Sequence, residues 1–215
     1  NLEEEYEIYK NLYSCNAIYV TTNYDDYLDK ISKNYIPGSY FGDEEDSAAN
    51  NRKVFIRKEE LLISNLDNGN ILHIHGSVED EKNMIGSIVD YINHYQENSE
   101  IPILLKEIFN NYTVLFVGYG LEEYEILDFI INKASMGEDE IRHYMLLPMF
   151  KEQENLLRLQ ESYYNELGIE LRPYNISDNG YDQLIEVVKN WSNIIKKESK
   201  TQTFLDKIKI IDEVI

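Results

Sequence analysis

The fold of this chain is decided by two stretches, Ala17-Ile18-Tyr19-Val20-Thr21-Thr22-Asn23-Tyr24-Asp25 and Ile71-Leu72-His73-Ile74-His75-Gly76-Ser77. In each, a short apolar run ends in a polar motif, which is typical of a buried strand that enters a loop. In open α/β sheets, side chains at the carboxyl ends of strands project into a crevice where ligands bind. We therefore expect Asn23 and His75 to act together on one substrate, although they lie far apart in the sequence.

The rest of the chain alternates between apolar runs and segments with helical spacing of apolar residues. Strands are predicted over residues 17–22, 54–57, 71–75, 112–117, 142–147 and 169–174, with Pro148 stopping the fifth. Helices are predicted over the first dozen residues and over 25–32, 90–97, 101–110, 122–133, 150–167 and 181–197. Strands separated by helices of this length predict parallel βαβ units and hence an α/β fold.

One large domain is predicted over residues 1–197, followed by a tail or the start of a further region over 198–215. Residues 34–53 are predicted to form a flexible loop or insertion, because Pro37-Gly38, Phe41-Gly42 and an acidic run interrupt the apolar pattern there. The chain begins with Asn1 and a half-formed helical pattern. We therefore expect the N-terminal part of the domain to be missing from this sequence.

Composition narrows the class of protein. The chain has 40 acidic and 20 basic residues, a net charge of −20, which disfavours general binding to nucleic-acid backbones. No apolar stretch approaches the ~18–20 residues of a membrane span, and the acidic N-terminus differs from the basic start of a signal peptide. The single cysteine, Cys15, excludes an intramolecular disulfide and a Cys-rich zinc site. We expect a cytoplasmic domain that binds neither nucleic acid nor membrane.

The two histidines at the end of the 71–75 strand allow three interpretations. Residues two apart on a strand face the same side, so His73 and His75 could bind a metal ion together, although no third ligand has a diagnostic spacing. Alternatively, His75 acts as a general base beside Gly76, and His73 lies deeper in a structural role. In the third interpretation both are partly buried histidines with satisfied hydrogen bonds and no chemistry.

Two further motifs carry candidate ligand contacts. The Asn23 amide can both donate and accept, which suits a sugar hydroxyl or a water, while Asp25 also fits a helix N-cap. The glycines of Gly118-Tyr119-Gly120 permit a tight turn and close approach of a ligand. The dinucleotide fingerprint is incomplete, since Glu123 stands where a third glycine is needed. A carboxylate repels phosphate, so Glu123 suits ribose hydroxyls or is simply solvated.

In order and spacing, these motifs resemble the sirtuin-like domains of bacterial anti-phage defence proteins. The resemblance rests on Thr21-Thr22-Asn23-Tyr24-Asp25, on Ile74-His75-Gly76, on Phe116-Val117-Gly118-Tyr119-Gly120-Leu121 and on the closing unit over residues 168–174 with its following helix. It covers roughly residues 15–195. The combination is more specific than any one of its motifs.

The resemblance implies a Rossmann-like fold, with a mostly parallel sheet and helices on both faces, that takes NAD as its substrate. Asn23 and His75 stand at the positions of the family's catalytic Asn and His. The same resemblance implies further contacts to NAD from Thr22, Asp25, Gly76, Gly118, Tyr119, Gly120 and Glu123. Protein deacylases of the wider family bind zinc through four cysteines. Because this chain has one, no metal is expected, and NAD hydrolysis is favoured over deacylation.

The sequence departs from the family's pattern at three points. Gly120 stands where the defence domains usually have Ser, and Glu123 stands where they usually have Asp. The family's glycine-rich phosphate loop belongs to a strand-helix unit ahead of the Asn motif, whereas residues 1–30 contain no glycine. Either this unit is missing from the sequence or the phosphate site is lost, and the start at Asn1 favours the first explanation.

The expected activity is therefore that of an NAD+ glycohydrolase, which releases nicotinamide and ADP-ribose and depletes NAD in anti-phage defence. The expected partners are NAD, further copies of the chain in a homo-oligomer, and a phage protein or defence-system component as activator. Three alternatives stay open: a sensor that binds NAD or ADP-ribose without cleaving it, a metal-dependent hydrolase that uses His73 and His75, and a domain that only mediates assembly.

Overall fold

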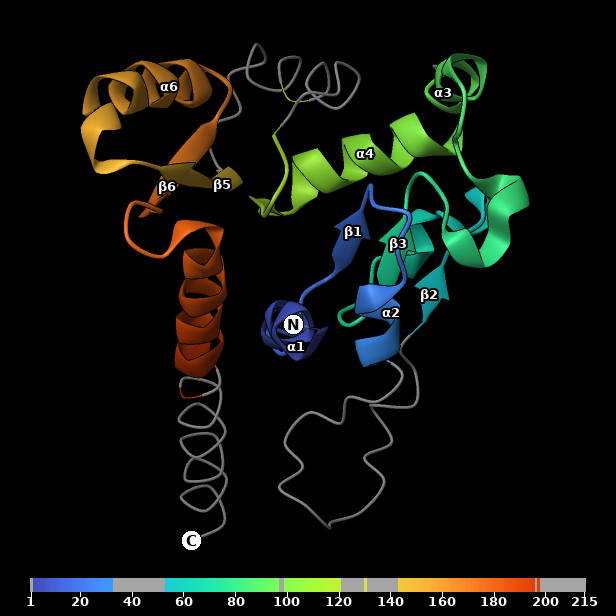
Figure 1. Ribbon diagram of the computed structural model, residues 1–215. Helices are drawn as coiled ribbons and strands as arrows, with labels where there is room; N and C mark the ends of the chain where they lie inside the picture. Colours follow the sequence, from blue (N-terminus) through green and yellow to red (C-terminus); the bar gives the residue numbers. More distant parts are fainter. Residues whose placement is uncertain are drawn as a thin grey trace, which may run out of the picture.

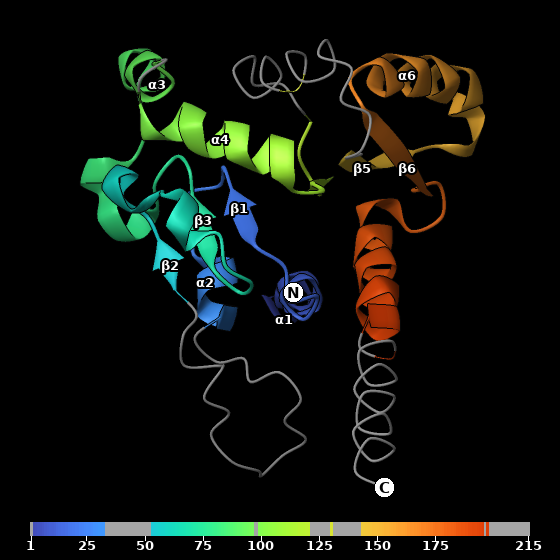
Figure 2. The same cartoon turned by 180° about the vertical axis from the view of Figure 1, so that it is seen from behind.

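The computed structural model describes residues 2–32, 53–96, 99–120, 130, 143–195 and 197. Figure 1 colours these segments along the sequence, and Figure 2 shows them from behind. Three predicted segments lie outside the described residues, apart from positions 53 and 130: the loop over 34–53, the helix over 122–133 and the tail over 198–215.

The described elements alternate as the sequence predicts. The helices are α1 Leu2–Tyr13, α2 Tyr27–Ser32, α3 Ile88–His94, α4 Glu100–Asn111, α6 Glu154–Glu166 and a last helix over 183–195. The strands are β1 Tyr19–Thr21, β2 Val54–Phe55, β3 Ile71–His73, β4 Leu115–Phe116, β5 His143–Met149 and β6 Ile169–Asn175. Short 3-10 helices lie at Lys58–Glu60, Ile63–Asn65, Val78–Asn83, Lys151–Gln153 and Gly180–Asp182. Within these ranges, no helix is both long enough and apolar enough to cross a bilayer.

The strands form two sheets of three, in the orders β1-β3-β2 and β4-β5-β6. Each pair of neighbouring strands is parallel, which confirms the predicted α/β fold with parallel strands. The two sheets lie apart, and α4 extends from the side of β3 to the side of β5 in both views (Figures 1 and 2). The first sheet carries both of the strand-end motifs, and the second carries the strand that precedes Gly118.

The strands predicted over 17–22, 54–57, 71–75 and 112–117 are shorter in the structure. The predicted stop at Pro148 is wrong in the opposite direction, because β5 continues through this proline to Met149. The pairing of β5 explains why the proline is tolerated. The Tyr144 N–H donates to the Val114 carbonyl beside β4, and N–H groups on one side of a parallel strand alternate with those on the other. The nitrogen of Pro148 therefore faces the β4 side, where β4 has already ended at Phe116. The missing N–H leaves no ladder hydrogen bond unmade.

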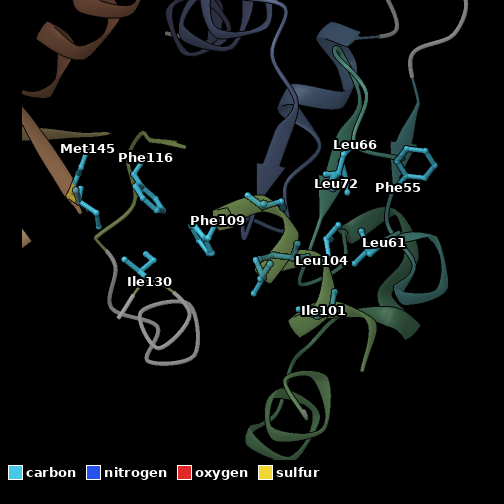
Figure 3. Packing of buried hydrophobic residues seen from close by; sticks show 14 of the residues in the cluster. Phe55, Leu61, Leu66, Leu72, Ile101, Leu104, Phe109, Phe116, Ile130 and Met145 are labelled. Carbon is cyan, nitrogen blue, oxygen red and sulfur yellow. The ribbon is translucent and has the colours of Figure 1, made fainter. Parts of the chain in front are cut away.

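A cluster of buried apolar side chains packs between α4 and both sheets (Figure 3). The helix presents one apolar face at helical spacing, made by Ile101, Leu104, Leu105, Ile108 and Phe109. Strands of the two sheets add Phe55, Leu72, Phe116, Met145, Ile169 and Leu171. One shared core thus holds together two sheets that do not hydrogen-bond to each other, and this core carries the loops at the strand ends.

We expect Leu104→Ala to lower the free energy of unfolding by about 2–5 kcal/mol, because removal of this side chain leaves a cavity in the core. Leu104 is 1% exposed, whereas Ile103 on the same helix is 54% exposed. Ile103→Ala is therefore the matched control, with an expected change within about 0.5 kcal/mol. Chemical denaturation measures both variants, and equal losses would contradict the burial of this helix face.

Candidate functional site

The pairing of β1 with β3 brings the two polar motifs to one edge of the first sheet. In this parallel pair, Thr21 lies opposite His73. Asn23 and His75 each follow two residues later, so both leave the sheet at the carboxyl ends of adjacent strands. A hydrogen bond joins the two segments directly, since Nδ1 of His73 lies 3.2 Å from the carbonyl oxygen of Asn23. The expected meeting of the two motifs at one strand edge is therefore present in the fold.

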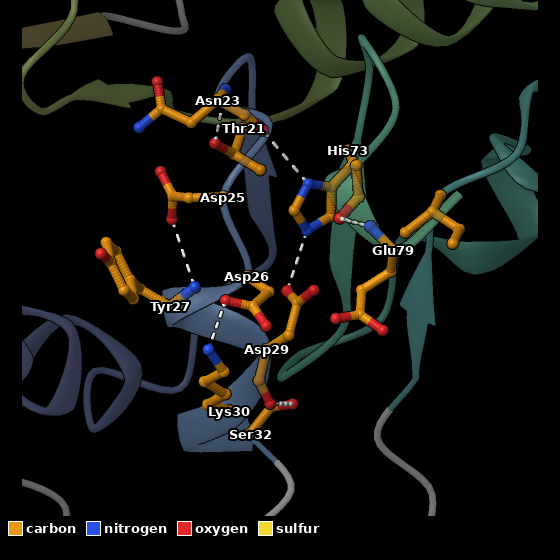
Figure 4. Close-up of polar contacts among 12 residues, drawn as sticks. Thr21, Asn23, Asp25, Asp26, Tyr27, Asp29, Lys30, Ser32, His73 and Glu79 are labelled. Carbon is orange, nitrogen blue, oxygen red and sulfur yellow. Dashed lines mark hydrogen bonds and ion pairs between the residues drawn. The ribbon is translucent and has the colours of Figure 1, made fainter. Parts of the chain in front are cut away.

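Asn23 is held by its backbone and leaves its side chain accessible. Its N–H donates to Oγ1 of Thr21 at 3.0 Å, and its carbonyl oxygen faces His73. The side chain is exposed and, among the described residues, has no hydrogen-bond partner for its amide. Figure 4 shows this amide pointing away from His73. An exposed amide on a fixed backbone can donate to and accept from a ligand.

Acidic side chains follow Asn23 at the start of α2. A carboxylate oxygen of Asp25 accepts from the N–H of Tyr27 at 3.2 Å, which satisfies one of the free N–H groups at the helix start. Asp26 forms an ion pair with Lys30 one turn later, at 2.7 Å. The hydrogen bond from Lys30 lowers the pKa of Asp26. Thr22 lies partly buried in the same loop.

His75 lies in the turn after β3 and is surrounded by aromatic rings. Its side chain is buried, with the residue 6% exposed, and its Nε2 lies 2.8 Å from the hydroxyl oxygen of Tyr95. The rings of Tyr91, Tyr95 and His94 stand edge-on to it, with centroids 5.8, 6.0 and 6.0 Å away. Tyr24 lies at 6.4 Å. These contacts fix the plane of the imidazole and shield it from water.

Gly76 is required by the tight loop that follows His75. Its φ is +82°, a conformation that side chains disfavour. A Cβ at this position would lie 2.7 Å from the carbonyl oxygen of Asn83. The chain returns close to the strand end, because the Ile85 N–H donates to the carbonyl oxygen of His75 at 3.0 Å. Gly76 therefore lets a second segment pack directly against the candidate site.

His73 lies deeper than His75 and makes different contacts. Its side chain is fully buried, and Nε2 lies 2.8 Å from Oδ1 of Asp29. Both ring nitrogens of His73 are thus engaged, which leaves neither of them free for a metal ion. In the described ranges, no group of three or more His, Cys, Asp or Glu side chains is placed to hold one. β3 ends at His73. His75 therefore lies beyond the strand, where side chains no longer alternate between the two faces of the sheet, and the two imidazoles need not face the same side.

His94 on α3 places a second imidazole against His75. It is 3% exposed, and in the part of the chain that the structure describes its ring nitrogens have no hydrogen-bond partner of ordinary geometry. Burial lowers the pKa of His94 to about 4, and the charge of His75 acts in the same direction, while the backbone at Ile74 opposes both. His94 is therefore neutral at physiological pH.

The third motif lies at the end of β4 in the second sheet. Gly118 has a φ of +65°, which agrees with the predicted tight turn, and the Tyr119 ring stacks on Phe116 with centroids 6.0 Å apart. Gly120 closes the described part of this loop, and Glu123 lies outside the described residues. Strand pairing does not join this loop to the edge that carries Asn23 and His75, because β4 and β1 belong to different sheets.

Sequence reasoning missed the residues that surround the two histidines. Tyr91, His94 and Tyr95 reach His75 from α3 and its C-terminal end, and Asp29 reaches His73 from α2. The sequence did contain one indication of this cluster, because Tyr91 and Tyr95 are four residues apart and therefore share one face of a helix. Nothing in the order of residues says which element that face packs against, so the assignment needed the tertiary structure.

Replacement of Gly76 should destabilise the protein more than replacement of another glycine with positive φ. Gly168 has a φ of +72° with open space around its Cβ position, whereas a Cβ at position 76 meets backbone atoms at under 3 Å. We expect Gly168→Ala to lower the free energy of unfolding by about 1 kcal/mol and Gly76→Ala to lower it by clearly more. Denaturant titration of both variants tests this, and equal effects would show that the loop can relax.

His94 should make stability depend on pH in a defined direction. The unfolded chain protonates this histidine near its ordinary pKa of 6.5, whereas the folded protein resists protonation until about pH 4. The unfolded state therefore binds more protons between these values, and the free energy of unfolding falls as the pH is lowered from about 6.5 to about 4. We expect His94→Phe to lose less stability than the unmodified protein over this range in denaturant titrations. Parallel pH profiles for the two proteins would contradict the prediction.

Comparison with known proteins places these features in a family. Residues 17–170, well over half of the chain, match the SIR2-like domain. A protein called Defense-associated sirtuin 2, from Bacillus subtilis, is 29% identical over 110 residues, which cover 50% of this chain and 10% of that protein. The chain thus spans about a tenth of the length of this relative. The predicted resemblance and Rossmann-like fold class are confirmed, because the match includes both strand-end motifs and the parallel strands that carry them: the chain belongs to the family of SIR2-like domains.

Proposed function

We propose that this domain cleaves NAD+ between nicotinamide and ribose to give nicotinamide and ADP-ribose. The observation that carries the proposal is the parallel register of β1 and β3, which brings Asn23 and His75 to one edge of a sheet. Membership of the SIR2-like family supports NAD as the substrate. The defence role is supported by the name of the Bacillus subtilis relative, Defense-associated sirtuin 2.

Cleavage of the bond between nicotinamide and ribose requires few functional groups from a protein. Nicotinamide leaves as a neutral molecule from a cationic N-glycoside, so its departure needs no general acid. The transition state resembles an oxocarbenium ion, as in other glycosyl transfers. The site must therefore hold the ribose, shield the developing cation from bulk solvent, and supply a water with its proton acceptor. An edge with one buried imidazole and one exposed amide fits these three tasks.

His75 supplies the base in this proposal. A neutral imidazole can take a proton from a ribose hydroxyl or from the attacking water. Tyr95 fixes the plane of the ring through Nε2. If Nε2 is the nitrogen that accepts the proton, Tyr95 must give up this contact to the substrate. His94, which stays neutral beside it, adds no opposing charge when His75 becomes a cation.

Asn23 orients the reacting groups. Its exposed amide can donate to a ribose oxygen and accept from a water, and a fixed backbone reduces the entropy lost when these contacts form. The nearby carboxylate of Asp25 favours hydroxyl groups over phosphates, because like charges repel. This edge therefore suits the nicotinamide ribose, and the pyrophosphate is bound elsewhere.

The remaining contacts extend along the dinucleotide. We place Thr22 and Gly76 beside the nicotinamide ribose, and the loop of Gly118, Tyr119 and Gly120 with Glu123 at the adenosine ribose, as the family resemblance implies. No metal takes part in the proposed reaction. Activation by a phage protein or another defence component, and assembly into a homo-oligomer, complete the proposal for the intact protein.

Removal of the base or of the orienting amide should abolish most NAD cleavage. We expect His75→Gln and Asn23→Ala each to lower kcat by about a hundredfold or more, measured as nicotinamide release by the intact protein in the presence of its activator. Chelator should leave the rate unchanged. Asn179→Ala, at an exposed asparagine in the loop after β6, is the matched control and should retain full activity.

Binding measurements separate the competing functions. Calorimetry with NAD should give similar affinities for the unmodified protein and for His75→Gln, because the proposed base acts on the transition state. Binding of NAD without nicotinamide release by the unmodified, activated protein would favour a sensor. Activity that survives both substitutions would refute the assignment of Asn23 and His75.

A further inference from the structure

Two buried ionisable residues below the candidate site are not used by the proposed chemistry. His73 ends β3 with its side chain fully buried, and the side chain of Asp29 on α2 is 4% exposed. A buried charge without a partner is costly, so such residues are retained where their contacts compensate each other. Figure 4 shows the pair between α2 and the strand end, with Asn23 on the opposite side of the imidazole.

The contacts of His73 determine how many protons the pair holds. Nδ1 lies 3.2 Å from the carbonyl oxygen of Asn23, and a carbonyl can only accept, so Nδ1 must carry a proton. Nε2 lies 2.8 Å from a carboxylate oxygen of Asp29. Two lone pairs at this distance repel, so one further proton lies between these atoms. The pair is then either an imidazolium with a carboxylate or a neutral imidazole with a carboxylic acid, and both forms have no net charge.

We propose that Asp29 and His73 form a two-proton pair that positions Asn23. Asp29 fixes the orientation of the imidazole, and the Nδ1 proton fixes the carbonyl group of Asn23. The other side of the same residue is held by Thr21, which accepts from the Asn23 N–H. The side-chain amide of Asn23 takes its direction from this backbone, because no described residue holds the amide itself. The pair is therefore a positioning device and does not touch the substrate.

The functional part of this inference rests on the proposed role of Asn23 in NAD cleavage, whereas the proton count does not. The count is tested on the unmodified protein with ¹⁵N-labelled histidine, by NMR detection of protons on the ring nitrogens of His73. We expect a proton on Nδ1 at neutral pH, either together with a proton on Nε2 or with Nε2 accepting from Asp29. A neutral ring with its only proton on Nε2 would overturn the proposal, because the lone pair of Nδ1 would then face the Asn23 carbonyl.

Substitutions of Asp29 test the positioning role. Asp29→Asn can still donate an N–H to Nε2 of a neutral His73 and should keep kcat within about threefold of the unmodified protein. Asp29→Leu removes the partner and should lower kcat about tenfold or more with little change in KM, since misplaced catalytic groups slow the chemical step. The backbone amide of Asn23 should exchange with solvent faster in Asp29→Leu than in Asp29→Asn.

The matched control is Asp26→Leu, on the same helix, which removes an ion pair to the exposed Lys30 and should leave kcat and the Asn23 amide unchanged. Circular dichroism verifies that each variant is folded. Equal behaviour of Asp29→Asn and Asp29→Leu in both kcat and amide exchange would refute the positioning role. If the unmodified protein releases no nicotinamide, the proposed function fails, and the NMR and exchange results still decide the inference about His73.

Discussion

The parallel pairing of β1 with β3 is the constraint on which the rest of the site depends. Opposite Thr21 lies His73, and this register sends Asn23 and His75 out at the same edge. The register is locked by burial, since Ile71 and Leu72 on β3 are both fully buried. Their side chains point to opposite faces, Ile71 into the cluster with Tyr13 and Leu72 into the core beside α4. A slip by one residue would exchange the two faces of the strand and place each side chain in the wrong cluster. Packing of apolar groups thus determines where the polar groups meet.

His73 and His75 are only two residues apart in the sequence, but their contacts differ because β3 ends at His73. His73 is still on the strand and faces Asp29 of α2, whereas His75 lies in the turn and faces Tyr95 after α3. The buried imidazole ties the first sheet to a helix and to the loop that holds Asn23. The turn that releases His75 depends on Gly76, whose positive φ and crowded Cβ position allow no other residue without rearrangement. The close packing of residues 83–85 against the turn both holds the site in place and excludes any side chain at position 76.

The aromatic surroundings of His75 show how much of a site can be invisible in a sequence. The chain has 18 tyrosines, and composition does not distinguish those that cover the surface from those that pack on an imidazole. Tyr24, Tyr91 and Tyr95 reach His75 from two separate segments. The low pKa of His94 likewise follows from burial, which depends on what the rest of the chain places around it. Spacing within α3 indicated a shared helix face and could not identify its partner.

The sequence by itself determined the alternation of strands and helices, the parallel α/β class and the two strand-end motifs, because apolar periodicity and turn residues act locally. It misjudged the end of β5, since tolerance of Pro148 depends on where the neighbouring strand β4 ends. The tertiary structure alone decided the division into two sheets on one shared core, the engagement of His73 by Asp29 and Asn23, and the aromatic shell of His75. These features arise from contacts between segments far apart in the chain, and such contacts are fixed only when burial selects one packing of the elements.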